Sequence, residues 1–152
     1  MPLRERIMAL DVGEARIGVA ISDPEGIIAA PLTVIPAEDT NAALDDIVHL
    51  VSKNGIKRIV VGMPRSLSGE LGAQARFTKG FIRQLMPRCN IPIDTWDERF
   101  STIAANNVLR QGKSSRKERK ERRDAVAAAL ILQAYLERQR FISVEDRDSS
   151  CD

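Results

Sequence analysis

The chain begins with two short apolar runs that a glycine-containing loop separates. The first run spans Ile7 to Leu10 and ends at a carboxylate, Asp11, and the second spans 16–21. Two such runs around a short loop that contains Gly13 predict an antiparallel hairpin. The first run is apolar at every position, which is typical of a central strand buried on both faces. Asp11 is therefore expected where a central strand leaves the sheet, and burial of a carboxylate there needs compensation.

The apolar positions further along the chain predict three more strands and four helices. Strands are expected at 26–34, 56–61 and 91–95. Helices are expected at 40–54, 71–85, 100–109 and about 115–138, and Gly55 is a natural end for the first of them. Three early strands followed by alternating helices and strands predict an α/β fold. We expect a five-stranded mixed sheet with helices on both faces.

Composition narrows the class of protein. The 152 residues are 43% hydrophobic and 29% charged, which is typical of a single soluble domain. No apolar run approaches the roughly 18 residues of a membrane span, so no membrane partner is expected. Cys89 and Cys151 lie far apart, which predicts neither a metal cluster nor a disulfide framework and fits a reducing cytoplasm. The single histidine, His49, gives little support to a histidine-based catalytic dyad.

Positive charge is concentrated directly before Asp124. The segment 113–123 holds seven basic and two acidic side chains, although the formal net charge of the whole chain is only +2. A basic run is commonly a solvated helix face. Its position next to an acid favours instead a surface that binds the backbone of a polyanion.

Two further acids stand at positions that favour a functional site. Glu98 follows the fifth predicted strand, and ligand sites in open α/β sheets gather at the carboxyl ends of parallel strands. Asp124 precedes the stretch AVAAALIL, which predicts a buried helix, so this acid needs a cation, an arginine or a metal as its partner. Together with Asp11, these acids form a set of three carboxylates that we expect to face one crevice.

Each acid also has a purely structural interpretation. An aspartate in the position of Asp11 can cap a loop amide. Glu98 can simply be an acid that a helix N-terminus stabilises, and Asp97 is a rival for either of its roles. Asp124 can form a salt bridge with Lys120 on the preceding helical turn.

A cluster of carboxylates predicts a particular chemistry. Sites rich in oxygen ligands suit Mg²⁺ or Mn²⁺ rather than zinc. In phosphodiester hydrolysis, two such ions roughly 3.5–4 Å apart activate the attacking water and stabilise the leaving oxygen. The basic run beside Asp124 would then hold the backbone of a nucleic acid.

Four motifs resemble those of one protein family, in the same order. They are ALDVGEARIGVAISD, VVGMPRSLSGELG, WDERFST and RRDAVAAALILQAYL, and they span residues 9–136. In these motifs the chain resembles the YqgF family, described as pre-16S rRNA nucleases and as Holliday-junction-resolvase-like proteins with a ribonuclease-H-like fold. The resemblance implies that Asp11, Glu98 and Asp124 are a catalytic, metal-binding triad. It also implies a bacterial cytoplasmic protein that acts in 5′-end maturation of 16S ribosomal RNA.

The resemblance also divides the chain. Residues 1–140 are expected to form a single ribonuclease-H-like nuclease domain. Residues 141–152 lie outside the motifs and are expected to be a polar, acidic and disordered tail.

Candidate nucleic-acid contacts lie beside these motifs. The glycine-rich loop 62–72 is either a loop that contacts the substrate or a turn that caps a helix, and it lacks the Gly-Lys-Ser/Thr end of a Walker loop. Three arginines next to motifs are predicted phosphate contacts: Arg16, Arg65 and Arg99. The basic run adds five more: Lys113, Arg116, Lys117, Lys120 and Arg123.

Three functions from different classes are compatible with these residues. The favoured one is a metal-dependent endonuclease that acts on precursor 16S ribosomal RNA, as a monomer or weak homodimer. A resolvase acting on branched DNA would use identical chemistry, and it should be a dimer with paired active sites. A transcription factor that binds nucleic acid without cleaving it is the third, although the presence of all three acids argues against a simple loss of catalysis.

Overall fold

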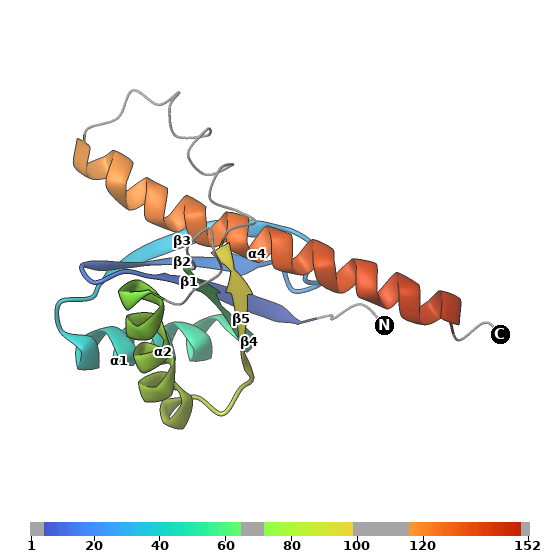
Figure 1. The fold of residues 1–152 in the computed structure, drawn as a ribbon, viewed down its shortest axis with the longest axis horizontal. Helices are drawn as coiled ribbons and strands as arrows, with labels where there is room; N and C mark the ends of the chain where they lie inside the picture. The colour runs from blue at the N-terminus through green and yellow to red at the C-terminus, as the bar shows by residue number, and fades with distance from the viewer. Residues whose placement is uncertain (1–4, 65–71, 99–115, 150–152) are drawn as a thin grey trace.

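The protein is built on a five-stranded mixed sheet with helices on both faces (Figure 1). This computed structural model describes residues 5–64, 72–98 and 116–149, with side chains throughout except at 116–122 and 141–149. The strands are β1 (Arg6–Val12), β2 (Arg16–Ser22), β3 (Ala29–Pro36), β4 (Ile56–Met63) and β5 (Ile93–Asp97). They lie in the order β3-β2-β1-β4-β5, with antiparallel pairs among the first three and parallel pairs from β1 to β5. The predicted class, hairpin and five-stranded sheet are confirmed.

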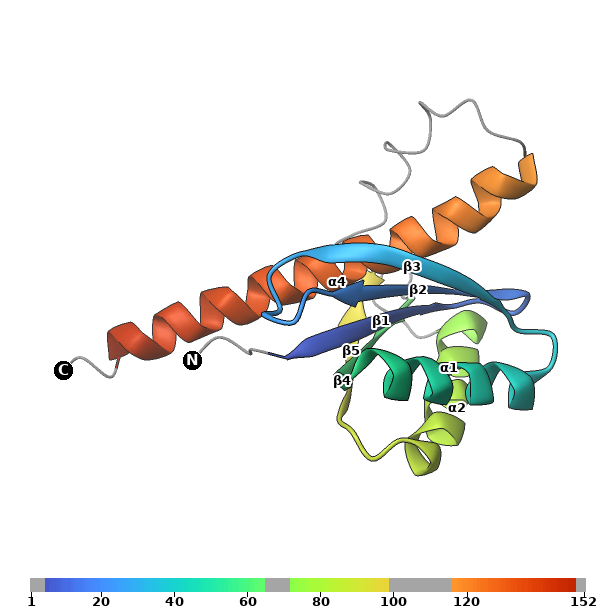
Figure 2. The ribbon, with the colours of Figure 1, turned by 180° about the vertical axis from the view of Figure 1, so that it is seen from behind.

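Strand β1 is central and is buried on both faces, as the sequence predicts. Met8 and Leu10 belong to the core shared with α1 (Thr40–Asn54) and α2 (Ala73–Leu85). Ile7 and Ala9 belong to the core on the opposite face, under α4 (Arg116–Ser149) (Figures 1 and 2). Side chains alternate between the faces of a strand, so Asp11 follows Ile7 and Ala9 on the α4 face.

Helix α4 packs closely on the sheet because small residues line the face beneath it. Ala9 and Ala20 are fully buried there. A Cβ atom on Gly18 would overlap the main-chain carbonyl oxygen of Asp124, so only glycine permits this approach. Gly18 is also the cross-strand partner of Asp11. The close packing therefore places the main chain of Asp124 beside the strand pair that carries Asp11.

Helix α1 has the bounds that the sequence predicts. Its N-cap residue, Asp39, accepts a hydrogen bond from the amide of Ala42 at 3.2 Å. Gly55 ends the helix in the left-handed conformation with a φ of 64°. Glycine takes this conformation without the steric cost that a Cβ would add, which makes it a reliable helix stop.

One proline precedes strand β5, and another follows helix α2, which ends at Leu85 as predicted. Strand β5 begins at Ile93, two residues later than predicted, because Pro92 has no N–H to donate to a neighbouring strand. Pro87 follows the end of α2 and lies in a short 3₁₀ turn, η1 (Met86–Arg88). The strand also ends at Asp97, two residues later than predicted, so Glu98 directly follows its last residue. The short helix predicted at 100–109 lies outside the described residues.

Helix α4 is longer than predicted. It continues past Arg138 to Ser149, because neither glycine nor proline follows Gly112 to end it. The backbone of the expected tail is therefore helical as far as Ser149, and the division into domain and tail stays a prediction. Within the described residues, no helix has both the length and the apolarity to cross a bilayer.

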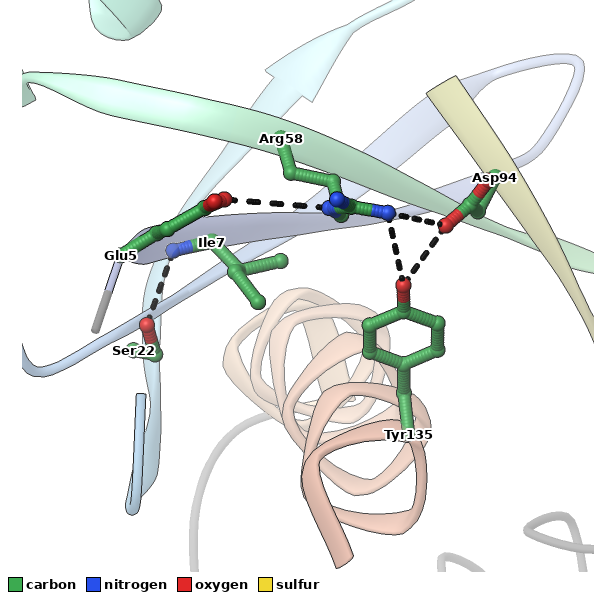
Figure 3. A network of polar contacts seen from close by, with 6 residues as sticks. All are labelled: Glu5, Ile7, Ser22, Arg58, Asp94 and Tyr135. Carbon is green, nitrogen blue, oxygen red and sulfur yellow. Dashed lines mark hydrogen bonds and ion pairs between the residues drawn. The ribbon is translucent and has the colours of Figure 1, made fainter. Parts of the chain in front are cut away.

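A polar network fastens the middle of α4 to β4 and β5 (Figure 3). The hydroxyl of Tyr135 donates to Asp94 Oδ2 at 2.6 Å, and Arg58 Nη1 donates to the same oxygen at 2.9 Å. Glu5 lies 3.8 Å from Arg58 Nε. Burial and the Asp94 carboxylate raise the pKa of Tyr135 to about 12, so its hydroxyl stays a donor at physiological pH. The rings of Tyr135 and Trp96 also form a T-shaped pair, with 6.2 Å between their centroids and 87° between their planes.

The contact at Gly18 generates a stability prediction. Gly18→Ala forces a Cβ against the main chain of α4, which cannot yield as a flexible side chain would. We expect a loss of about 3 kcal/mol in the free energy of unfolding, or failure to fold. Gly80→Ala is the control, because a Cβ on Gly80 in α2 meets nothing within 4 Å. It should stabilise the protein by about 0.5–1 kcal/mol. Urea unfolding of both variants checks this, and equal effects would contradict the close approach.

Candidate active site

The side chains of Asp11 and Glu98 meet above strand β4, at Gly62, where the strand has no side chain to separate them. Gly62 in β4 pairs with Trp96 in β5, and the neighbouring Leu10 and Val61 pair across β1 and β4. A Cβ on Gly62 would lie 2.7 Å from Glu98 Oε1. The Glu98 side chain therefore occupies the space above Gly62. From there its carboxyl group forms a side-chain hydrogen bond with Asp11, although the two elements are not neighbours in the sheet.

Burial and mutual repulsion make these two carboxyl groups share a proton. Burial, the hydrogen bond with Asp11 and the nearby charges of Asp11 and Asp97 raise the pKa of Glu98 to about 8. Burial likewise raises the pKa of Asp11, the hydrogen bond from Glu98 opposes this rise, and the charge of Asp124 adds to it. Glu98 is thus the protonated partner that donates to the Asp11 carboxylate near neutral pH.

Asp124 lies on the same face of the sheet but is held by an arginine. Arg16 Nε donates to Asp124 Oδ2 at 2.8 Å, and the two side chains are 37% and 24% exposed. Arg16 is the first residue of β2, directly after the hairpin turn that the Gly13 amide closes on the Arg16 carbonyl oxygen at 2.9 Å. The partner of Asp124 is therefore an arginine 108 positions earlier in the chain. The alternative partner, Lys120, has a side chain outside the described part of the structure.

The three acids offer the donors that a hard divalent cation prefers. Asp11 and Glu98 are in contact, and the charge of Asp124 reaches Asp11. Within residues 5–64, 72–98 and 116–149, no three acidic, histidine or cysteine side chains are arranged to hold one metal ion as they stand. The all-carboxylate donor set nevertheless fits Mg²⁺ or Mn²⁺ chemically, provided that Glu98 gives up its proton and Asp124 turns from Arg16.

The other predicted site residues are only partly described. Arg123 is exposed on α4 next to Asp124. The residues Arg116, Lys117 and Lys120 lie on the same helix, with side chains outside the described part. Arg65, Arg99 and Lys113 lie outside the described residues altogether, as does most of the glycine-rich loop.

Sequence reasoning missed two glycines and one ion pair at this site. Gly62 and Gly18 admit Glu98 and the main chain of Asp124 respectively. A glycine inside a strand is itself a signal of close approach by another group. Gly18 stands inside a predicted strand, whereas Gly62 directly follows one and proves to lie within β4. The pairing of Arg16 with Asp124 depends on how α4 crosses the hairpin, which no local pattern encodes.

Sequence comparisons find relatives over most of the chain. The RuvX family, described as Holliday junction resolvase, matches residues 5–138. A Chloroflexus aggregans protein named "Putative pre-16S rRNA nuclease" is 46% identical over 136 residues, which are 90% of this chain and 96% of that protein. A protein of the same name from Desulforamulus reducens is 43% identical and covers 87% of this chain and 96% of its own length. The resemblance that the motifs indicated is confirmed.

Solved structures share the fold. T. thermophilus RuvC, in complex with a Holliday junction substrate, has a TM-score of 0.59 at 13% identity, over 88% of this chain and 95% of that one. The fowlpox virus resolvase, in complex with Holliday junction DNA, has a TM-score of 0.52 at 9% identity, over 87% of this chain and 97% of that one. At such identities the likeness is one of fold, and it confirms the predicted ribonuclease-H-like fold.

The shared proton predicts a pH dependence of stability. The pKa of Glu98 is about 8 in the folded protein against an ordinary value of 4.5. Protonated Glu98 therefore favours folding below about pH 4.5, and this contribution is lost as the pH rises towards 8. We expect the free energy of unfolding in EDTA to fall by roughly 2 kcal/mol over this range, because partial exposure screens the full effect.

Glu98→Gln isolates this contribution. Glutamine keeps a donor for Asp11 but cannot ionise, so the decline with pH should largely disappear in urea unfolding. Asp46→Asn, which alters an exposed acid on α1, should keep the wild-type decline. An unchanged decline in Glu98→Gln would contradict the shared proton.

Proposed function

Because the chain belongs to the RuvX family, described as Holliday junction resolvase, we propose that it is a metal-dependent endonuclease that hydrolyses phosphodiester bonds. The observation that carries this proposal is the convergence of three acids on one face of the sheet: Asp11 near the carboxyl end of β1, Glu98 directly after β5, and Asp124 on α4 above them. The names of the relatives favour the 5′ end of precursor 16S ribosomal RNA as the substrate. We place the protein in the cytoplasm, where that precursor is made.

We assign Asp11, Glu98 and Asp124 as the catalytic residues that hold Mg²⁺ or Mn²⁺. When bound, such an ion supplies Lewis-acid activation of the attacking water and of the leaving oxygen. Asp11 presents its carboxylate from the central strand of the sheet, whose apolar side chains belong to the cores on both faces. Glu98 brings a second carboxyl group over Gly62, and Asp124 brings the third from the helix that covers them.

The substrate would be bound through its phosphates. Arg123 is exposed on the turn of α4 that carries Asp124, so a phosphate beside the acidic cluster can reach it. We include the other basic residues predicted from the sequence: Arg16, Arg65, Arg99, Lys113, Arg116, Lys117 and Lys120. Such contacts position a nucleic acid without reading its sequence.

Resolution of branched DNA is the second candidate function. The description of the family and the fold shared with T. thermophilus RuvC favour it. The chemistry at the phosphorus would be the same, so the two candidates differ in substrate and in assembly. A resolvase must cut two strands and therefore requires two copies of the chain, whereas a monomer or weak homodimer is enough to trim RNA.

Cleavage by Asp11→Asn tests the assignment. Asparagine keeps the shape of the side chain but removes the charge that a divalent cation needs. We expect the variant to lose at least 100-fold in cleavage rate, an order-of-magnitude figure for an essential electrostatic group. The assay incubates wild type and variant with 5′-extended 16S rRNA and with a four-way DNA junction, each with Mn²⁺ or EDTA.

Asp46→Asn is the matched control, because it removes the same charge from an exposed site on α1. It should cleave at the wild-type rate. Wild-type cleavage by metal-scrubbed Asp11→Asn would falsify the assignment. Faster cleavage of the junction than of the RNA, together with a dimer in sedimentation, would select the resolvase instead.

The basic run predicts a change in the salt dependence of binding. Replacing Arg116, Lys117, Lys120 and Arg123 with alanine should weaken binding of all sequences similarly. For every one of these side chains that binds a phosphate, its replacement should reduce the slope of log affinity against log salt by about 0.7 for single strands or 0.9 for duplex.

The control removes four charges from the opposite side of the sheet. In this control variant, four exposed basic side chains on α1 and α2 are replaced with alanine: Lys53, Arg76, Lys79 and Arg83. This variant should keep the wild-type slope in fluorescence anisotropy. Equal slopes for both fourfold variants would show that the basic run is only a solvated helix face and does not bind phosphates.

A further inference from the structure

The ion pair between Arg16 and Asp124 occupies a carboxylate that the proposed metal site needs. Arg16 Nε donates a hydrogen bond to Asp124 Oδ2 at 2.8 Å. As they stand, the acids of the described residues form no three-membered metal site. Arg16 thus provides the positive charge beside Asp124 that a divalent cation would otherwise provide.

Arg16 is not required to bring Asp124 to this position. The main chain of Asp124 is already set by its contact with Gly18, where a Cβ would overlap its carbonyl oxygen. Gly18 in turn faces Asp11 across the hairpin. The arginine therefore governs only the direction and the charge balance of the Asp124 side chain, which can turn about its own bonds while the helix stays in place.

Arg16 can also exchange its partner. It is more than a third exposed, and a part-exposed ion pair contributes little net stability, so breaking it costs about 1 kcal/mol or less. Among the described residues, only its Nε is hydrogen-bonded, which leaves both Nη groups available for an incoming acceptor. A guanidinium binds phosphate oxygens as readily as carboxylates, through the same fork of donors. A nucleic-acid phosphate therefore offers Arg16 an equivalent partner.

We propose that Arg16 is a counter-ion shared between Asp124 and the substrate. It pairs with Asp124 in the empty site, and it moves to a phosphate oxygen when Asp124 turns to a divalent cation. The phosphate then draws Arg16 away from Asp124, which frees this carboxylate for the metal ion. The metal ion likewise holds Asp124, which frees Arg16 for the phosphate, so the two ligands bind with positive coupling. The inference rests on the proposed nuclease function, and it makes Arg16 a residue that links two ligands rather than a simple phosphate contact.

The first experiment measures Mn²⁺ binding without nucleic acid, from the electron paramagnetic resonance signal of unbound Mn²⁺. Arg16→Gln should bind Mn²⁺ roughly 5–10-fold more tightly than wild type, because the competing charge is gone, a factor within the usual range of coupling between two ligands. Arg16→Lys keeps the charge and should stay near the wild-type affinity. The control is Arg88→Gln, which removes an arginine paired with Asp45 at 2.9 Å on the far side of the sheet. It should leave Mn²⁺ binding unchanged.

The second experiment measures binding of 5′-extended 16S rRNA by anisotropy, with EDTA or with Ca²⁺, and a gel verifies that the RNA stays intact. In EDTA, Arg16 remains with Asp124, so Arg16→Gln should match wild type. With Ca²⁺, wild type should bind the RNA several-fold more tightly, and Arg16→Gln should gain much less.

The possible outcomes distinguish a failure of the Arg16 exchange from a failure of the proposed nuclease function. Weaker or unchanged Mn²⁺ binding by Arg16→Gln would overturn the exchange, because Arg16 would then only orient Asp124. An equal drop in RNA affinity with and without Ca²⁺ would overturn it too, because Arg16 would be a permanent phosphate contact. Neither result touches the nuclease assignment, which depends on cleavage by Asp11→Asn. Failure of wild type to bind Mn²⁺ at all would overturn both.

Discussion

Helix α4 touches strand β2 at Gly18, where no side chain separates the main chain of the helix from the sheet. The position of Asp124 in the acidic cluster depends on this contact. It sets the height of Asp124 above the sheet, and the pairing of Gly18 with Asp11 sets its lateral position. The Tyr135–Asp94 hydrogen bond, about three turns along the helix, fixes the register of α4 against β5. The steric contact at Gly18 and the hydrogen bond of Tyr135 thus together fix the position of α4 over the sheet.

The cluster resolves its own electrostatic repulsion in two ways. Asp11 and Glu98 share a proton, because burial raises both pKa values and the second negative charge is unfavourable so close to the first. Asp124 is instead neutralised by Arg16. The folded chain therefore carries three neighbouring carboxyl groups without the full repulsion between three partly buried negative charges. Under the proposed function, a divalent cation would replace both the shared proton and the Arg16 guanidinium as the source of positive charge.

Sequence patterns were sufficient for the parts of this protein that depend on local physics. The hairpin, the central position of β1 and the bounds of α1 follow from continuous apolar runs, a loop that contains Gly13, helical spacing and the stop at Gly55. The positions of Asp11 and Glu98 at strand ends also follow from these patterns. The contacts between elements do not, because they depend on the path of α4 over the sheet. Hence the Arg16–Asp124 ion pair and the placement of the Glu98 side chain over Gly62 could not be predicted from the sequence and are seen only in the structure.

The order of the elements along the chain has a consequence for biosynthesis. Asp11 lies in the first strand, whereas Asp124 and the apolar residues that cover Ile7 and Ala9 lie in the last helix. A nascent chain that has not yet produced α4 lacks one of the three acids and leaves one face of its sheet exposed to water. Docking of the last helix therefore completes the hydrophobic core and the acidic cluster in the same event. A chain synthesised only as far as β5 therefore cannot assemble the complete acidic cluster.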